Sequence, residues 1–199
     1  MPGRVEYEPA SVKDLLAEMK DTAELLIDLS YSAVLHGSPD IAREVLELEE
    51  RMDVLQLRAR MSLLMAARNP EDAETLAPVL GIIGAAEKVS DASGDIAKVV
   101  IEEVGVPDAI RGALPEAVER LVRAELASDS DYAGRTLADV NLETDTGVRV
   151  IAVRRGGDWI PNPGAETTLE ADDVLLLRGP EESVGDVYEA ASGEAYDPA

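Results

Sequence analysis

The spacing of apolar residues changes once along this chain, and that change sets the fold class it can adopt. Up to about residue 104, apolar side chains recur every three or four positions, which is the period of an amphipathic helix. Beyond the Gly- and Pro-containing stretch 105–117 the period becomes two. There Val122, Ala124 and Leu126 alternate with charged residues, as they would on a half-buried strand. The sequence therefore predicts a helical part followed by a small α+β part.

Start and stop residues divide the first part into three helices. Ser11 can cap a first helix that Gly37 ends, and Ser38 followed by Pro39 can begin a second. Residues 69–72, Asn-Pro-Glu-Asp, repeat this start signal for a third helix that stops at Gly105. Long helices with short connections favour an antiparallel bundle. We assign this three-helix bundle to residues 1–106, a linker to 107–117 and the α+β domain to 118–199.

The second part contains alternating strands and two short helical stretches. The expected strands lie near residues 122–126, 148–155, 159–161 and 173–179, and the expected helices lie at 133–140 and 180–191. We expect the last eight residues, SGEAYDPA, to be frayed.

The charge of the chain is strongly negative. It carries 41 Asp and Glu against 18 Lys and Arg, a formal net charge of -23. Such a surface repels nucleic acid and anionic lipid. It suits a cytoplasm of molar salt, where self-repulsion is screened, and we expect low salt to loosen the protein. An ordinary acidic protein is the alternative.

The sequence lacks the residues that several kinds of functional site require. The chain has no Cys and a single His, His36, so thiolate or His-rich metal sites and a Cys nucleophile are excluded. We find no Ser/His/Asp arrangement or phosphate-binding loop, and we expect no enzyme. No apolar run reaches the roughly 18 residues of a membrane span, and we see no signal-peptide pattern and expect no signal peptide. We expect a cytoplasmic protein, peripheral to the membrane only through a transporter partner.

Five carboxylates on two of the expected helices are candidate metal ligands. They stand one helical turn apart on each helix and are Glu49, Asp53, Glu87, Asp91 and Asp95. Carboxylates at this spacing share a face and can bind a divalent cation when two helices face each other. The alternative is that they are paired or solvated.

The third helix carries two apolar stripes. One is uninterrupted and contains Val79, Ile82, Ala86, Val89, Ser93, Ile96 and Val100. The other contains Leu80, Ile83, Ala97 and Ile101 and is interrupted by Glu87, Ser90 and Gly94. We therefore expect Glu87 to face another helix, where an unpaired carboxylate would be costly.

Two family resemblances follow from particular stretches. Residues 118–191 resemble the RCK C-terminal domain, also called TrkA-C, through SDYAGRTLADV and GVRVIAVRRGGDWIPNPGAETTLEADDVLLLRGP. The family usually has Gly-Asp where this chain has Asp172-Asp173. The helical part resembles the PhoU family through ELEERMDVL (47–55) and AAEKVSDASGDIAKVV (85–100).

These resemblances imply a function. PhoU-like and TrkA-C parts in one chain are a combination seen in archaeal regulators of cation transport. The combination implies a homodimeric regulatory subunit that docks on a membrane-embedded channel or transporter for potassium or another cation. In some TrkA-C relatives cyclic di-AMP binds across the dimer interface. The alternative is a PhoU-like metal-binding adaptor in phosphate transport signalling.

Two adjacent arginines are the candidate ligand-binding residues. Arg154 and Arg155 end an apolar strand beside Ile-Pro-Asn-Pro at 160–163, and Arg forks match phosphate oxygens. With the TrkA-C resemblance we take the following residues as the ligand set: Val150, Ile151, Arg154, Arg155, Ile160 and Asn162. The alternative is that the arginines form surface ion pairs.

Overall fold

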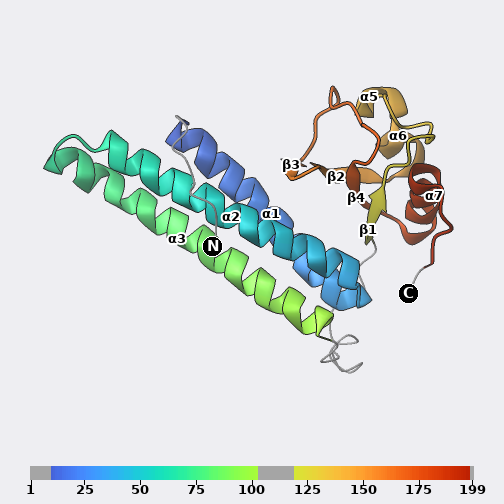
Figure 1. Ribbon diagram of the computed structural model, residues 1–199, viewed down its shortest axis with the longest axis horizontal. Helices are drawn as coiled ribbons and strands as arrows, with labels where there is room; N and C mark the ends of the chain where they lie inside the picture. Colours follow the sequence, from blue (N-terminus) through green and yellow to red (C-terminus); the bar gives the residue numbers. More distant parts are fainter. Residues whose placement is uncertain (1–9, 103–118, 198–199) are drawn as a thin grey trace. The chain divides into compact units, whose positions relative to one another are not determined.

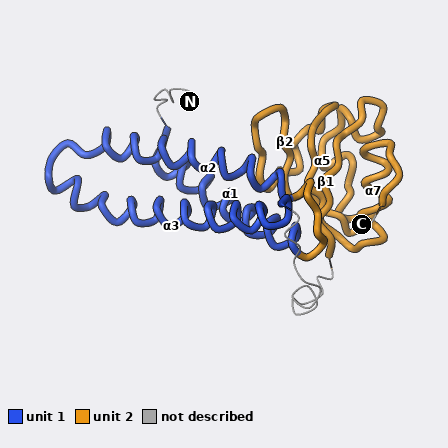
Figure 2. Tube along the Cα trace, turned by 60° about the horizontal axis from the view of Figure 1, so that its bottom comes forward, with its two compact units in different colours: residues 1–34, 42–106 blue, residues 35–41, 107–199 orange. Residues whose placement is uncertain are grey.

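The computed structural model describes residues 10–102 and 119–197. The expected linker, 107–117, lies outside these ranges. Two compact units make up the chain, residues 1–34 with 42–106 and residues 35–41 with 107–199 (Figure 2). No helix in the described ranges is both long and apolar enough to cross a bilayer.

The helical unit contains the three helices that the sequence predicts, α1 (Val12–His36), α2 (Pro39–Ala66) and α3 (Pro70–Ile101) (Figure 1). The start signals act as expected. The Asn69 side chain caps α3 by accepting a bond of 2.8 Å from the Asp72 N–H, and Pro70 occupies the first turn. The three-helix bundle is confirmed.

The interior of the bundle follows the predicted spacing. Large side chains of α1 and α2 that are buried there include Met19, Leu26, Leu29, Val45, Leu48, Met52 and Leu55. Ion pairs between side chains of different helices lie around this interior. Arg51 of α2 pairs with Glu18 of α1, and Arg60 of α2 pairs with Glu87 of α3 at 2.8 Å.

The second unit is built on a four-stranded antiparallel sheet with the order β1-β4-β2-β3 (Figure 1). The strands are β1 (Arg120–Glu125), β2 (Arg149–Arg155), β3 (Asp158–Pro161) and β4 (Val174–Gly179). α7 (Glu181–Ser192) packs against β1 and β4, and α6 (Leu142–Thr146) packs against β2. The predicted α+β fold is confirmed.

One face of this sheet holds a continuous apolar core. It joins strand residues to α7 and includes Val122, Ala124, Val150, Val153, Leu175, Leu177, Val184 and Val187. Leu169, from the loop before β4, is completely buried in it.

Two predictions for this unit are wrong in detail. The helix expected at 133–140 spans only Leu137–Val140, because Thr136 and Asp139 form a capping box and Asn141 then takes a left-handed conformation. The described part of the C-terminal tail is anchored rather than frayed. The Tyr196 ring lies 5.5 Å from that of Tyr188, and the Tyr196 N–H donates to the Glu189 carboxylate at 3.0 Å.

Candidate functional site

The hairpin of β2 and β3 carries five of the six candidate ligand-binding residues, and Asn162 follows it directly. Arg154 and Trp159 are direct partners across the two strands. The Arg154 guanidinium carbon lies 5.8 Å from the centre of the Trp159 ring, and its Nη1 donates to the Gly156 carbonyl at 3.4 Å. Arg154 is half-buried, while Trp159 is 5% exposed. Trp159 is thus a packing residue on which the arginine rests.

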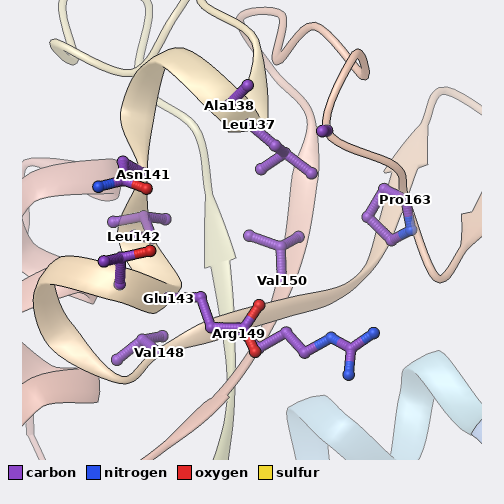
Figure 3. A pocket seen from close by; sticks show the side chains of 11 residues that line it. Leu137, Ala138, Asn141, Leu142, Glu143, Val148, Arg149, Val150 and Pro163 are labelled. Carbon is purple, nitrogen blue, oxygen red and sulfur yellow. The ribbon is translucent and has the colours of Figure 1, made fainter.

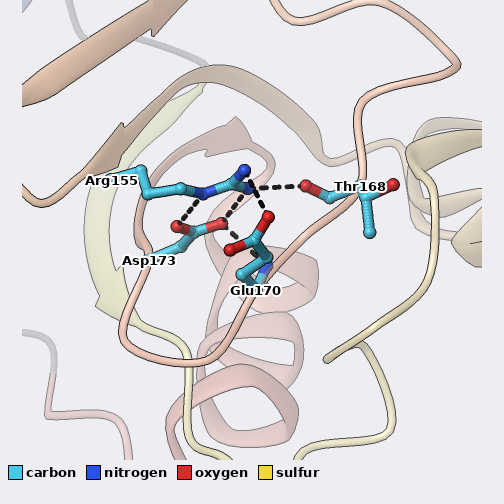
Figure 4. A network of polar contacts seen from close by, with 4 residues as sticks. All are labelled: Arg155, Thr168, Glu170 and Asp173. Carbon is cyan, nitrogen blue, oxygen red and sulfur yellow. Dashed lines mark hydrogen bonds and ion pairs between the residues drawn. The ribbon is translucent and has the colours of Figure 1, made fainter.

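Arg155 has a different environment (Figure 4). Its Nε and Nη2 donate to the two carboxylate oxygens of Asp173, both at 2.8 Å. Nη1 donates to Glu170 and Nη2 also donates to the Thr168 carbonyl, both at 2.7 Å. The bond to Asp173 raises the pKa of Arg155 above its ordinary value. The guanidinium therefore fixes the loop before β4 to the end of β2.

Asp173 makes this network costly to disturb. Its side chain has 0% exposure, and its second oxygen also accepts from the Glu170 N–H at 2.8 Å. A buried carboxylate needs such partners to offset its lost hydration. The structure thus places Arg155 in an ion pair, the alternative that the sequence left open, and we remove it from the ligand-binding set.

The other four candidates do not converge on one cavity. Val150 belongs to the core, and Ile160 packs against it half-buried. A register shift between Val150 and Ala152 places Ile151 at a bulge in the pairing with β4. Asn162 is exposed with φ 47°, and its N–H donates to the Ile151 carbonyl at 2.9 Å.

A cavity of about 260 Å³ lies between the short helices α5 (Leu137–Val140) and α6 and the start of β2 (Figure 3). Its lining is apolar at Leu137, Leu142, Val148, Val150 and Pro163, and polar at Asn141, Glu143, Thr144 and Arg149. One cation and one carboxylate can bind a small polar group above an apolar floor.

The sequence reasoning found only Val150 of these lining residues. The cavity needs two short helices to end beside a strand, and the α5–α6 junction depends on the left-handed Asn141. The capping pair Thr136–Asp139 was the one local signal for that junction.

The five candidate metal ligands are mostly engaged by cations of the chain. Glu87 pairs with Arg60 at 2.8 Å, as expected for a carboxylate facing another helix, and Glu49 lies 3.5 Å from Lys98. Asp95 lies 3.7 Å from the same Lys98.

Asp53 and Asp91 complete the set. Partial loss of hydration raises the pKa of Asp53, and the carboxylates of Asp91 and Glu87 raise it further. The described residues contain no group of three or more His, Asp or Glu side chains that could hold a metal ion. The contacts of Glu87, Glu49 and Asp95 favour the alternative, paired or solvated carboxylates, and the metal site stays a prediction.

Comparison with known families matches both parts of the chain. Residues 16–100 match the PhoU domain and residues 121–192 match the TrkA-C domain. Both are regulatory domains, and the two matched ranges do not overlap in sequence.

Known proteins that resemble the chain match it over short stretches. The Ktr system potassium uptake protein C of Bacillus subtilis is 31% identical over 55 residues, 28% of this chain and 25% of that protein. The Ktr system potassium uptake protein A of Vibrio alginolyticus is 34% identical over 64 residues, 32% of this chain and 29% of that protein. The chain thus spans less than a third of each relative. A solved RCK_C domain dimer of S. agalactiae BusR in complex with c-di-AMP is 22% identical, with 36% of this chain and 91% of that chain covered and a TM-score of 0.33.

Proposed function

Because the chain joins a PhoU domain to a TrkA-C domain, we propose that it is a non-catalytic regulatory subunit of a cation transporter. The observation that carries the proposal is the TrkA-C match over residues 121–192, together with the likeness to two potassium uptake proteins. The transporter would be a membrane-embedded partner, and the chain would act on it from the cytoplasm.

The TrkA-C domain is the ligand-sensing part of this proposal. Its ligand would be a small anion, with cyclic di-AMP as the first candidate. A two-fold nucleotide can be shared by two copies of the domain, so that each copy contributes one Arg fork to one phosphate. In each copy Arg154 would serve the phosphate and the exposed Asn162 would contact the base, while Ile160, opposite Val153, stays in the core packing.

The geometry of the hairpin supports this assignment. Arg154 rests on the flat face of Trp159. This contact restricts the Arg154 side chain before a ligand arrives, so binding costs less side-chain entropy. Pro161 and Pro163 flank Asn162 and restrict the backbone after β3, which also reduces the entropy lost on binding. Arg155 holds β2 to the loop before β4, and so supports the hairpin without contacting the ligand.

Titration calorimetry with cyclic di-AMP in molar KCl tests the ligand. We expect one nucleotide for every two chains. Arg154→Ala should weaken binding about tenfold or more, since a hydrogen bond between charged groups contributes about 1.5–3 kcal/mol. Arg123→Ala removes the same charge from β1, at the opposite edge of the sheet, and should leave the affinity unchanged.

Two further results would change this account. A loss of affinity in Arg149→Ala but not in Arg154→Ala would move the ligand into the cavity beside α5 and α6. No binding at millimolar nucleotide, with the fold and the assembly intact, would contradict a cyclic di-AMP site and leave Arg154 as a packing residue.

A further inference from the structure

The outward side of α3 is apolar along most of its length. The residues that α3 buries are Ile83, Ser90, Ser93, Gly94 and Ala97, which are mostly small. Larger apolar side chains lie on another side of the helix, with Ile82 59% and Val99 42% exposed. We define the α3 outer face by six residues, Ile82, Ala85, Val89, Ala92, Ile96 and Val99; Ala85 and Ala92 are exposed, and Val89 and Ile96 are half-buried.

The spacing of the α3 outer face is that of a helix-pairing seam. Its residues follow one another at intervals of three, four, three, four and three, the a/d pattern of a coiled coil. Exposed apolar stripes of this length mark interaction surfaces. From Ile82 to Val99 the seam runs for about 26 Å along the helix. The structure therefore leaves a seam without a partner within the described helical unit.

The seam is symmetric about the point between Ser90 and Asp91. An antiparallel second copy of α3 would place Ala85 opposite the partner's Ile96 and Val89 opposite the partner's Ala92. Each small residue then meets a larger one, which is the arrangement that fills space well between helices. A parallel copy would instead place alanine on alanine and isoleucine on isoleucine.

Charge also favours a second copy on this face. The chain carries -23, so most of its surface repels another copy. Residues 75–101 hold three acidic residues, Glu87, Asp91 and Asp95, and two basic ones, Lys88 and Lys98, which leaves only one net negative charge there.

The edge of the seam adds complementary charges. Lys88 and Asp95 border it on the same side, at the g positions that face each other in an antiparallel pair. Antiparallel pairing brings Lys88 near the partner's Asp95 on one side of the symmetry point, and repeats the contact on the other. The Asp95 side chain is 81% exposed, and its pair with Lys98 on the same helix, at 3.7 Å, leaves it open to a further contact with the partner.

We propose that two copies of this chain pair through the α3 outer face in antiparallel orientation. This interface belongs to the PhoU domain and does not depend on the ligand or on the transporter partner. It would join two copies whether or not their TrkA-C domains also associate.

Disulfide cross-linking tests both the face and the orientation. The chain has no Cys, so introduced cysteines are unique. Antiparallel pairing predicts that Ala85→Cys chains cross-link to Ile96→Cys chains when the two are mixed, refolded together and oxidised. Neither variant should cross-link to itself, because its two copies would be about 16 Å apart along the helix, beyond the about 7 Å that a disulfide allows.

The outcomes of this experiment are distinct. Self-cross-linking of Ala85→Cys at the level of the mixture would indicate parallel pairing and overturn the proposed orientation. Absence of any cross-link in the mixture would overturn the interface. Ala73→Cys, which is exposed in the first turn of α3 and outside the seam, is the matched control and should not cross-link in either mixture.

Sedimentation in molar KCl gives an independent measurement. We expect a particle of twice 21.2 kDa for the wild type. Ala92→Glu places a carboxylate against the partner's Val89 and should raise the dissociation constant on the order of 100-fold, because that charge would lose its hydration. Ala73→Glu adds the same charge outside the seam and should leave the dissociation constant of the dimer unchanged.

Circular dichroism should show unchanged helix content in both variants, since Ala73 and Ala92 are exposed in the single chain. An unchanged dissociation constant in Ala92→Glu, together with no cross-link between Ala85→Cys and Ile96→Cys, would refute the proposal. Cross-linking with a dimer that survives Ala92→Glu would support the face and indicate a second contact elsewhere.

Discussion

Arg155→Ala should lower the free energy of unfolding of the α+β unit by about 3–5 kcal/mol, the usual cost of leaving a buried charge without its partner. The variant removes both guanidinium bonds to Asp173, whose side chain has 0% exposure. Only the bond from the Glu170 N–H would remain to that carboxylate in the network of Figure 4. The Thr168 carbonyl and Glu170 lose their contacts with β2 in the same step.

Denaturant unfolding followed by Trp159 fluorescence measures this effect. Trp159 is the single Trp of the chain and lies in the α+β unit, so it reports on that unit. Arg154→Ala is the matched control, because it makes the same change at the preceding residue. It should lower the free energy of unfolding by less than about 1 kcal/mol. The free energy of unfolding of Arg155→Lys should lie between those of the two alanine variants. Lysine keeps the positive charge but cannot donate two parallel hydrogen bonds to one carboxylate. Equal unfolding midpoints for the two alanine variants would contradict the structural role of Arg155.

Leu169→Ala is expected to have the second largest effect, about 2–5 kcal/mol. Leu169 is completely buried, and its backbone bonds hold the loop before β4 to residues 134–135: its N–H donates to the Arg135 carbonyl and its own carbonyl accepts from Gly134. Truncation would leave a cavity in the core at the base of this loop. The Arg155 network lies directly after it, at Glu170 and Asp173.

The same fluorescence experiment applies, with Leu64→Ala as the control. Leu64 is 76% exposed on α2 in the helical unit, so its truncation should leave the Trp159 transition unchanged. A Leu169→Ala transition that coincides with the wild type would show that the loop is not anchored by this side chain. The loop would then be stabilised by Arg155 and by its backbone bonds to residues 134–135.

The order of helices and strands could be predicted because each boundary has a local signal. Asn69 and Pro70 begin α3 by satisfying its first N–H groups, and this requires no knowledge of the rest of the fold. The strands could be predicted because apolar and polar residues alternate along them. The extent of α5 was not, because Thr136 with Asp139 caps the helix three residues later than the predicted start.

The candidate site was less predictable because its partners are distant in sequence. Adjacent strand residues point to opposite faces of a sheet, so Arg154 and Arg155 cannot easily serve one ligand. That rule was available from the sequence. The partner of Arg155, Asp173, lies 18 residues away and is brought to it only by the pairing of β2 with β4.

The third helix shows the same limit. Both of its apolar stripes were visible in the sequence, but only the packed bundle determines which one is buried. The structure buries Ile83, Ser90, Gly94 and Ala97 of the interrupted stripe and only Ser93 of the other, and Gly94 leaves space for the Glu49 side chain. An added Cβ at Gly94 would collide with the Glu49 carboxylate. The small residues allow close approach of α2, and much of the larger apolar surface remains outside.

Cation uptake in cells that lack this chain tests the central claim most directly. The account predicts that deletion changes potassium or other cation uptake and leaves phosphate uptake unchanged. Wild-type chain should restore the original rate, and Arg154→Ala, which keeps the fold but weakens the proposed ligand site, should restore it only in part. Altered phosphate uptake with unchanged cation uptake would contradict the account and favour a PhoU-like adaptor in phosphate signalling.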